Sequence, residues 1–168
     1  MKSLIYIGMK NMQTWFDEYG ASHKNSTNKA IHWICVPAIF FSLIGLLSLI
    51  PHDFLQIDSI GTWQSYLHFG SIFILVGMIF FFRTSVSMAM GMLFVSVAIL
   101  YFVNLINSNW SSNTWIVYLS IFVLAWIGQF IGHKIEGKKP SFFDDLKFLM
   151  IGPAWLLGFI YKKLGIPY

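Results

Sequence analysis

Long apolar stretches separated by short polar segments dominate the pattern of the chain. A helix needs about 20 apolar residues to cross the hydrocarbon core of a bilayer. Four stretches approach this length, and they cover residues 31–50, 65–82, 84–106 and 114–132. Between Lys29 and Lys134 the formally charged residues are Asp53, Asp58 and Arg83. The pattern therefore predicts an all-α integral membrane protein built as a four-helix bundle.

The second and third stretches are separated only by Arg83 and Thr84. A continuous helix from Ser65 to Ile106 would be about 60 Å long, twice the thickness of the hydrocarbon core. We therefore expect a tight turn at Arg83. Small residues one helical turn apart, such as Gly128 and Gly132, would allow neighbouring backbones to approach closely.

The two ends of the chain are expected to lie at the membrane surface. Residues 1–19 approximate an apolar helical stripe and predict an interfacial amphipathic helix, with Trp15 and Tyr19 at the headgroup level. The apolar segment 148–161 is short and contains Gly152 and Pro153, so it is expected to be an interfacial, re-entrant or bundle-packed helix. The whole chain, residues 1–168, is interpreted as a single membrane domain.

Composition and charge agree with this class and add an orientation. The chain is 57% hydrophobic and 11% charged, whereas soluble domains carry about 25% charged residues. The loops at 51–64 and 107–113 contain no lysine or arginine, so all basic residues fall on the other side. The positive-inside rule then predicts cytoplasmic termini, in the inner membrane of a bacterium or the endoplasmic reticulum of a eukaryote. The excess of basic over acidic residues is therefore explained by membrane topology and by attraction to anionic lipid headgroups, and not by nucleic-acid binding.

This topology divides the five histidines into two groups. His23, His32 and His133 lie at the cytoplasmic ends of the first and fourth spans and are able to meet. His52 and His68 lie at the opposite end, separated from the first group by most of the membrane thickness. Candidate chemistry is therefore expected around the first three.

Polar residues at helical spacing accompany these histidines. Asn28 lies four residues before His32, Gln129 lies four before His133, and Glu136 lies three after it, so each pair shares a helix face. A carboxamide inside an apolar span usually faces the bundle interior. A metal-bound imidazole normally donates its other N–H to a nearby acceptor, a role predicted for Asn28 and Gln129.

Three imidazoles with open positions around them are typical of a metal site. Neutral imidazoles suit iron, zinc, copper and nickel, and three facial ligands are the arrangement of non-haem Fe(II) oxygenases. Two ligand sets remain open: all three histidines, or two of them with Glu136. A single histidine at the headgroup level is more often an amphipathic side chain without a functional role than a metal ligand. The shared face and the amide partners favour the metal site.

Two segments resemble the signatures of a small membrane family whose best-known member is a 2-hydroxy-fatty-acid dioxygenase. The first is H-x4-N-x3-H, formed by His23, Asn28 and His32. The second is Q-x2-G-H-x2-E, formed by Gln129, Gly132, His133 and Glu136. The resemblance covers nearly the whole chain, because that family also has four spans and a short apolar C-terminal segment.

This resemblance implies an Fe(II)-dependent α-oxidation. A long-chain 2-hydroxy fatty acid and O2 would give an acid one carbon shorter and CO2, with His23, His32 and His133 as iron ligands. The substrate would arrive laterally from the bilayer, with its carboxylate at the headgroup level. Lys24, Lys29 and Lys134 are the candidates for neutralising that carboxylate.

Three other classes of membrane protein compete with this interpretation. Membrane di-iron hydroxylases need many more histidines in HxxHH-type clusters, which this chain lacks. A b-type haem protein with His32 and His133 as axial ligands is an alternative, because the two lie at one depth on different helices. A transporter or structural bundle is the non-enzymatic alternative, although the spans carry no acidic residue for proton coupling.

Overall fold

The computed structural model describes residues 11–55, 57–110, 113–137 and 148–168. The elements in these ranges are helices, with no strand among them, which confirms the all-α prediction. They are α1 (Met12–Gly20), α2 (Ser26–Ser48), η1 (Asp53–Leu55), η2 (Asp58–Tyr66), α3 (Phe69–Thr84), α4 (Val86–Asn109), α5 (Thr114–Ile135) and α7 (Ile151–Leu164). Residues 1–10 of the expected interfacial helix lie outside the described part of the chain.

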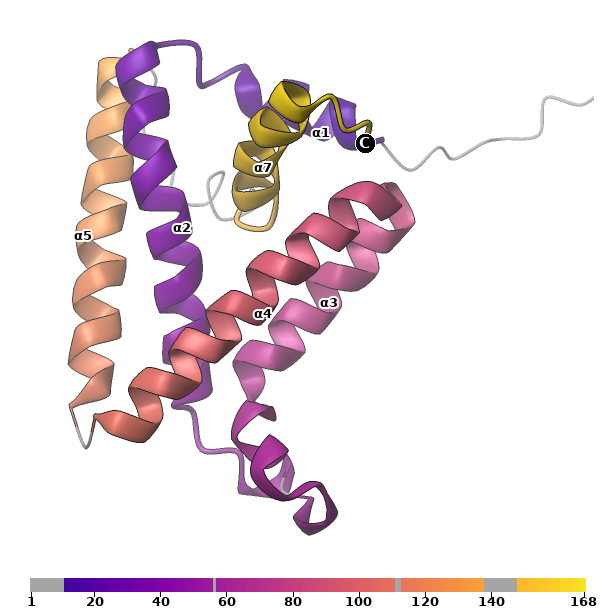
Figure 1. Cartoon of the computed structure of the whole chain (residues 1–168). Coiled ribbons are helices and arrows are strands. Elements are labelled where there is room, and N and C mark those ends of the chain that lie inside the picture. The colour runs from indigo at the N-terminus through magenta and orange to yellow at the C-terminus, as the bar shows by residue number, and fades with distance from the viewer. Residues whose placement is uncertain (1–10, 56, 111–112, 138–147) are drawn as a thin grey trace, which may run out of the picture.

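The helices form two antiparallel pairs that are inclined to each other (Figure 1). α5 packs along α2, and α3 packs along α4. The second pair contacts the first through α2, and α7 lies between α2 and α4 with α1 packed against it. The start of α2, the end of α5 and the α3–α4 turn lie at the same end of the molecule as α1 and α7.

Three helices, α2, α4 and α5, are long and apolar enough to cross a membrane. α3 has 16 residues, which corresponds to about 24 Å of helix and is shorter than the hydrocarbon core of about 30 Å. It reaches the required length only with the segment Ser59–Tyr66, from which it is bent by 79°. The fourth span of the predicted bundle therefore stays a prediction.

The ends of the helices follow local capping chemistry. α2 begins at Ser26, earlier than the expected residue 31, because the Asn25 side chain accepts hydrogen bonds from the backbone N–H groups of Thr27 and Asn28. α3 continues through Arg83, where the turn was expected, and ends at Thr84, with Ser85 in an extended conformation after it. The Ser85 hydroxyl then caps α4 by accepting from the N–H of Met88.

Many large apolar side chains of the described helices point outward. Examples with more than half of their surface exposed are Leu75, Val76, Phe94, Val97, Tyr101 and Leu124. In water such a surface would be an aggregation liability. The same faces are well matched to lipid, which agrees with an integral membrane protein.

α7 is a short helix whose first half is buried in the protein. It contains 14 residues, and Pro153 stands in its first turn, where the missing N–H leaves no intrahelical hydrogen bond unmade. The six residues from Ile151 to Leu156 are all buried. α7 packs against α1, α2 and α4, and the expected interfacial or re-entrant placement of segment 148–161 in the membrane stays a prediction.

Candidate metal centre

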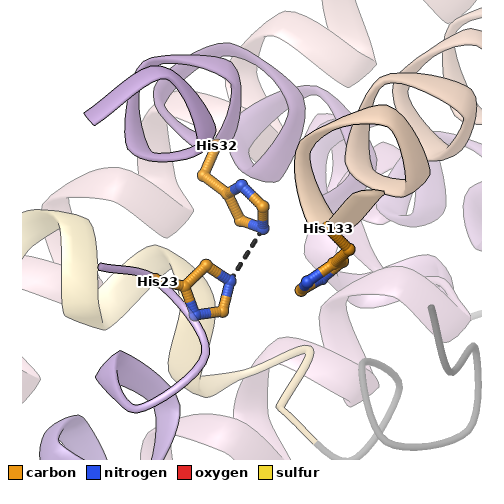
Figure 2. Close-up of side chains that lie close together, drawn as sticks. All are labelled: His23, His32 and His133. Carbon is orange, nitrogen blue, oxygen red and sulfur yellow. Dashed lines mark hydrogen bonds between the residues drawn. The ribbon is translucent and has the colours of Figure 1, made fainter. Parts of the chain in front are cut away.

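Three histidines from different parts of the chain converge at the end of the molecule where α2 begins and α5 ends. His23 comes from the loop between α1 and α2, His32 from α2 and His133 from the last turn of α5. Their exposed fractions are 4%, 0% and 4%. One ring nitrogen from each lies within 4.8 Å of the others, and the rings face one another in Figure 2. The group has the spacing to hold a metal ion.

Backbone carbonyl groups determine which nitrogen carries a proton in the rings of His23 and His32. Nδ1 of His23 lies 2.6 Å from the carbonyl oxygen of Tyr19, and Nδ1 of His32 lies 2.9 Å from that of Asn28. A carbonyl only accepts, so each Nδ1 is the donor and each neutral ring carries its lone pair on Nε2. These two Nε2 atoms lie 2.8 Å apart.

Two imidazole lone pairs at that separation repel each other unless a proton or a cation lies between them. Two Nε2 atoms that face each other, with both Nδ1–H groups donating to carbonyl oxygens, are the arrangement expected of histidines that bind a metal through Nε2. The donor set of His23, His32 and His133 therefore fits a metal that accepts imidazole nitrogen.

Glu136, at the end of α5, holds the loop that carries His23. Its Oε1 accepts from the backbone N–H of Lys24 at 2.8 Å, and its Oε2 accepts from that of Asn25 at 2.8 Å. The Nδ2 group of Asn28 donates to the same Oε2 at 3.0 Å. Burial acts to raise the pKa of Glu136, but these hydrogen bonds and the nearby His23 together lower it. The carboxylate thus ties the loop and α2 to α5.

The carboxamide of Asn28 differs from its expected role, and the role expected for Gln129 stays a prediction. The acceptor for His32 is the backbone carbonyl of Asn28 and not its carboxamide. The carboxamide of Asn28 donates instead to the carbonyl of Ser22 and to Glu136. Gln129 is 5% exposed and lines a small cavity of about 20 Å³ beside Tyr19.

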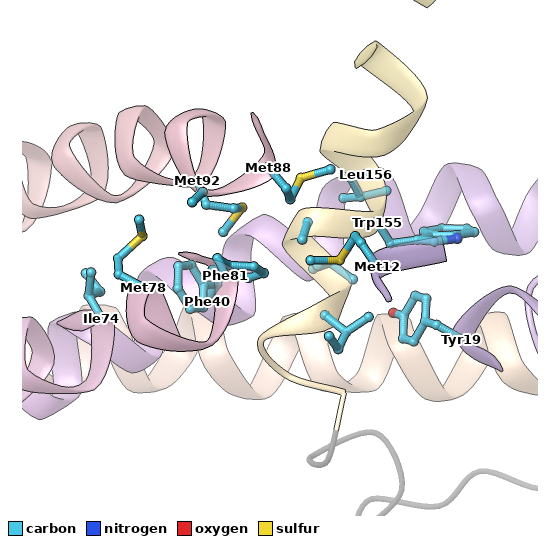
Figure 3. Packing of buried hydrophobic residues seen from close by; sticks show 14 of the residues in the cluster. Met12, Tyr19, Phe40, Ile74, Met78, Phe81, Met88, Met92, Trp155 and Leu156 are labelled. Carbon is cyan, nitrogen blue, oxygen red and sulfur yellow. The ribbon is translucent and has the colours of Figure 1, made fainter. Parts of the chain in front are cut away.

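Aromatic side chains form one wall of the centre. Tyr19 stacks on His23, with ring centroids 4.2 Å apart, and the ring of Trp155 lies 5.4 Å from His23. Figure 3 shows Trp155 and Tyr19 at one end of the apolar cluster that surrounds α7. The sequence placed Tyr19 at the headgroup level and did not single out Trp155. The only sequence feature that pointed toward Trp155 was the apolar character of the segment that forms α7.

A cavity of about 750 Å³ lies between α1 and α7 and reaches His23. Lys24 and Lys29, two of the predicted carboxylate partners, line it, whereas Lys134 is not among its lining residues. Lys162 of α7 also lines it. This lysine was assigned only to membrane topology by the sequence.

The remaining two histidines form a separate pair. The rings of His52 and His68 lie 6.3 Å apart near the start of α3. His68 caps α3, because its Nδ1 accepts from the N–H of Ser71 and the Ser71 hydroxyl accepts from the N–H of His68. This role is structural.

One comparison with known proteins identifies a family. A family model described as "2-hydroxy-palmitic acid dioxygenase Mpo1-like" matches residues 9–164. No curated protein and no solved structure matches the chain significantly.

Proposed function

The chain belongs to the Mpo1-like family of 2-hydroxy-palmitic acid dioxygenases, and on that basis we propose that it is an Fe(II)-dependent enzyme of fatty-acid α-oxidation. The reaction is a 2-hydroxy fatty acid plus O2 giving the acid one carbon shorter, CO2 and water. The bond between the carboxyl carbon and the hydroxyl-bearing carbon breaks. Four electrons leave the substrate and O2 accepts four, so no further reductant is required.

The observation that carries this proposal is the pair of Nε2 atoms of His23 and His32, 2.8 Å apart with both Nδ1 groups bound to carbonyls. His133 supplies the third nitrogen. Three protein ligands leave coordination positions open, which a dioxygenase needs and a closed structural site lacks. Zinc has no redox chemistry, and three facial ligands with open positions are the arrangement of non-haem Fe(II) oxygenases, so iron is the metal that we propose.

When bound, iron would supply Lewis acidity and redox chemistry toward O2. The chain's own residues do the rest. The three histidines hold the metal, and the carbonyls of Tyr19 and Asn28 hold two of the rings in the ligating tautomer. Lys24, Lys29 and Lys162 line the cavity that reaches His23 and give it a positive charge that attracts a carboxylate.

The geometry favours the all-histidine ligand set over the set in which Glu136 replaces one histidine. Both carboxylate oxygens of Glu136 are already used by backbone and amide donors. Oε2 is an acceptor for the buried carboxamide of Asn28, so recruiting it to a metal would leave one of the N–H groups of this carboxamide without an acceptor, at a cost of about 1–3 kcal/mol.

The same geometry disfavours the haem alternative. A haem ligated by His32 and His133 needs its flat macrocycle between the two rings. The ring of His23 lies 4.3 Å from that of His32 and 5.2 Å from that of His133. This third ring fills the space that the macrocycle would require.

The proposal predicts that purified protein in detergent binds iron, consumes O2 and converts 2-hydroxypalmitate to the 15-carbon acid. Glutamine substitutions of His23, His32 and His133, made singly, should each lower bound iron and abolish the product. His52→Gln is the matched control, because His52 lies in the separate pair near α3, and it should retain both. Iron-independent turnover, or loss of activity in the His52 variant alone, would refute the proposed site.

A further inference from the structure

The cavity between α1 and α7 has the size and the position of a ligand site. Its volume of about 750 Å³ falls within the range of about 300–1,000 Å³ that is common for small-molecule sites. It reaches the ring of His23, which belongs to the metal centre. A molecule in this cavity would therefore lie beside the metal ligands.

α7 gives this cavity an apolar wall that ends in a positive charge. Trp155, Phe159 and Lys162 are spaced i, i+4 and i+7, so they share one face of the helix, and all three line the cavity. Trp155 contacts Phe159 at a ring-centroid distance of 4.6 Å, and Trp155 is the member nearest to His23. Phe16 of α1 adds apolar surface opposite Gly158. This lining suits an amphiphile with an apolar chain and an anionic end.

Three lysines and one acidic residue line the cavity, and their surroundings differ. Asp17 already accepts a hydrogen bond from Nε2 of Gln13 at 2.7 Å. Lys24 lies on the loop that Glu136 holds by the backbone. Side chains of a helix lean toward its N-terminus. For Lys162 on α7 this is the direction of Trp155, which contacts His23. Unlike Lys24 and Lys29, Lys162 also shares a helix face with two aromatic residues of the lining.

From this arrangement we infer that Lys162 holds the carboxylate of a long-chain acid bound in the α1–α7 cavity, with the acid's hydroxyl-bearing end beside His23. The identity of the acid as a 2-hydroxy fatty acid rests on the proposed function. Lys162 is thus a specificity-determining residue that selects an anionic end. The alkyl chain follows the apolar surface of Phe16 and Phe159.

The test compares Lys162→Gln, Lys162→Arg and Lys163→Gln in the purified full chain. Lys163 is the matched control, because it is the next residue of the same helix and does not line the cavity. The dissociation constant is measured for two probes, radiolabelled 2-hydroxypalmitate and the neutral analogue hexadecane-1,2-diol. Both bear a 16-carbon chain and a hydroxyl at the second carbon, but only the first carries a charge.

Lys162→Gln should weaken binding of the acid about fivefold, as expected for one partly solvated ion pair, and should leave binding of the diol unchanged. Lys162→Arg should restore acid binding, and Lys163→Gln should match the wild type for both probes. In turnover, Lys162→Gln should raise KM more than it lowers kcat. A purely structural role would weaken both probes equally.

The outcomes separate this inference from the proposed function. If the wild type binds the acid through Lys162 but forms no shortened product, the binding site stands and the proposed reaction fails. If turnover occurs but Lys162→Gln and Lys163→Gln bind the acid equally well, the reaction stands and the role of Lys162 is refuted. Equal weakening of acid and diol by Lys162→Gln also refutes it.

Discussion

At the scale of single residues, Glu136 shows how the same side chain changes meaning between sequence and structure. From the sequence alone, its spacing from His133 makes Glu136 a candidate metal ligand. In the folded chain its carboxylate accepts hydrogen bonds from Lys24, Asn25 and Asn28, on two other segments. The spacing of residues in the sequence shows which side chains share a helix face. It does not show which backbone N–H groups of a distant loop will lie within hydrogen-bonding distance of that face.

We therefore predict that Glu136→Ala lowers the affinity for iron on the order of tenfold, the lower end of the range seen when groups that orient metal ligands are removed. Without the carboxylate, the loop is released and His23 loses its fixed position. Glu136→Gln should have a smaller effect, because its carbonyl oxygen still accepts. Metal titration of the apoprotein measures both, with Asp53→Asn at the other end of the molecule as the control.

A second measurement distinguishes positioning from ligation. The visible spectrum of the Co(II)-substituted protein reports the donor atoms around the metal. If Glu136 only positions the loop, Glu136→Gln should keep the wild-type spectrum at saturating Co(II). A changed spectrum would mean that the carboxylate is itself a ligand.

At the scale of elements, the close contact between α2 and α5 depends on two glycines. A Cβ atom on Gly128 would lie 2.5 Å from Sγ of Cys35, and one on Gly132 would lie 2.4 Å from Oδ1 of Asn28. The sequence predicted that these small residues permit close approach. It did not identify α2 as the partner, because hydropathy measures suitability for lipid and is nearly uniform around each of these helices.

Gly132→Ala is predicted to destabilise the protein by about 2 kcal/mol, within the range for an overpacked core. Asn28 is fully buried, and its carboxamide is bonded to Ser22 and Glu136, so it cannot move aside without losing these contacts. Thermal unfolding in detergent measures the effect, and bound iron should fall in parallel.

Gly20→Ala is the matched control for this substitution. A Cβ on Gly20 meets Nε1 of Trp155 at 3.6 Å, an ordinary contact. Alanine is also favoured over glycine in a helix by about 1 kcal/mol. This variant should be as stable as the wild type or more so. Equal destabilisation by the two alanines would contradict the steric argument.

At the scale of the whole molecule, the sequence predicted the grouping of the three histidines better than it predicted the bounds and packing of the helices. Charge placement grouped His23, His32 and His133 at one end, and the structure brings them together. The role of α7 could not be predicted, because a short apolar segment reveals only that it cannot span the bilayer. Its position between α2 and α4 depends on packing contacts such as the hydrogen bond from the Tyr161 hydroxyl to the Ser87 carbonyl.

The orientation of the molecule in the membrane is the last prediction that the charge pattern makes. Asp53 precedes α3 in a loop without basic residues, and Lys163 lies near the end of α7. In a Cys35→Ala background, which removes the single native thiol, Asp53→Cys should react with a membrane-impermeant maleimide on intact cells of a bacterial host. Lys163→Cys should react only after permeabilisation. The opposite pattern would place the metal centre and its cavity on the outer face, where the positive-inside rule would not have put them.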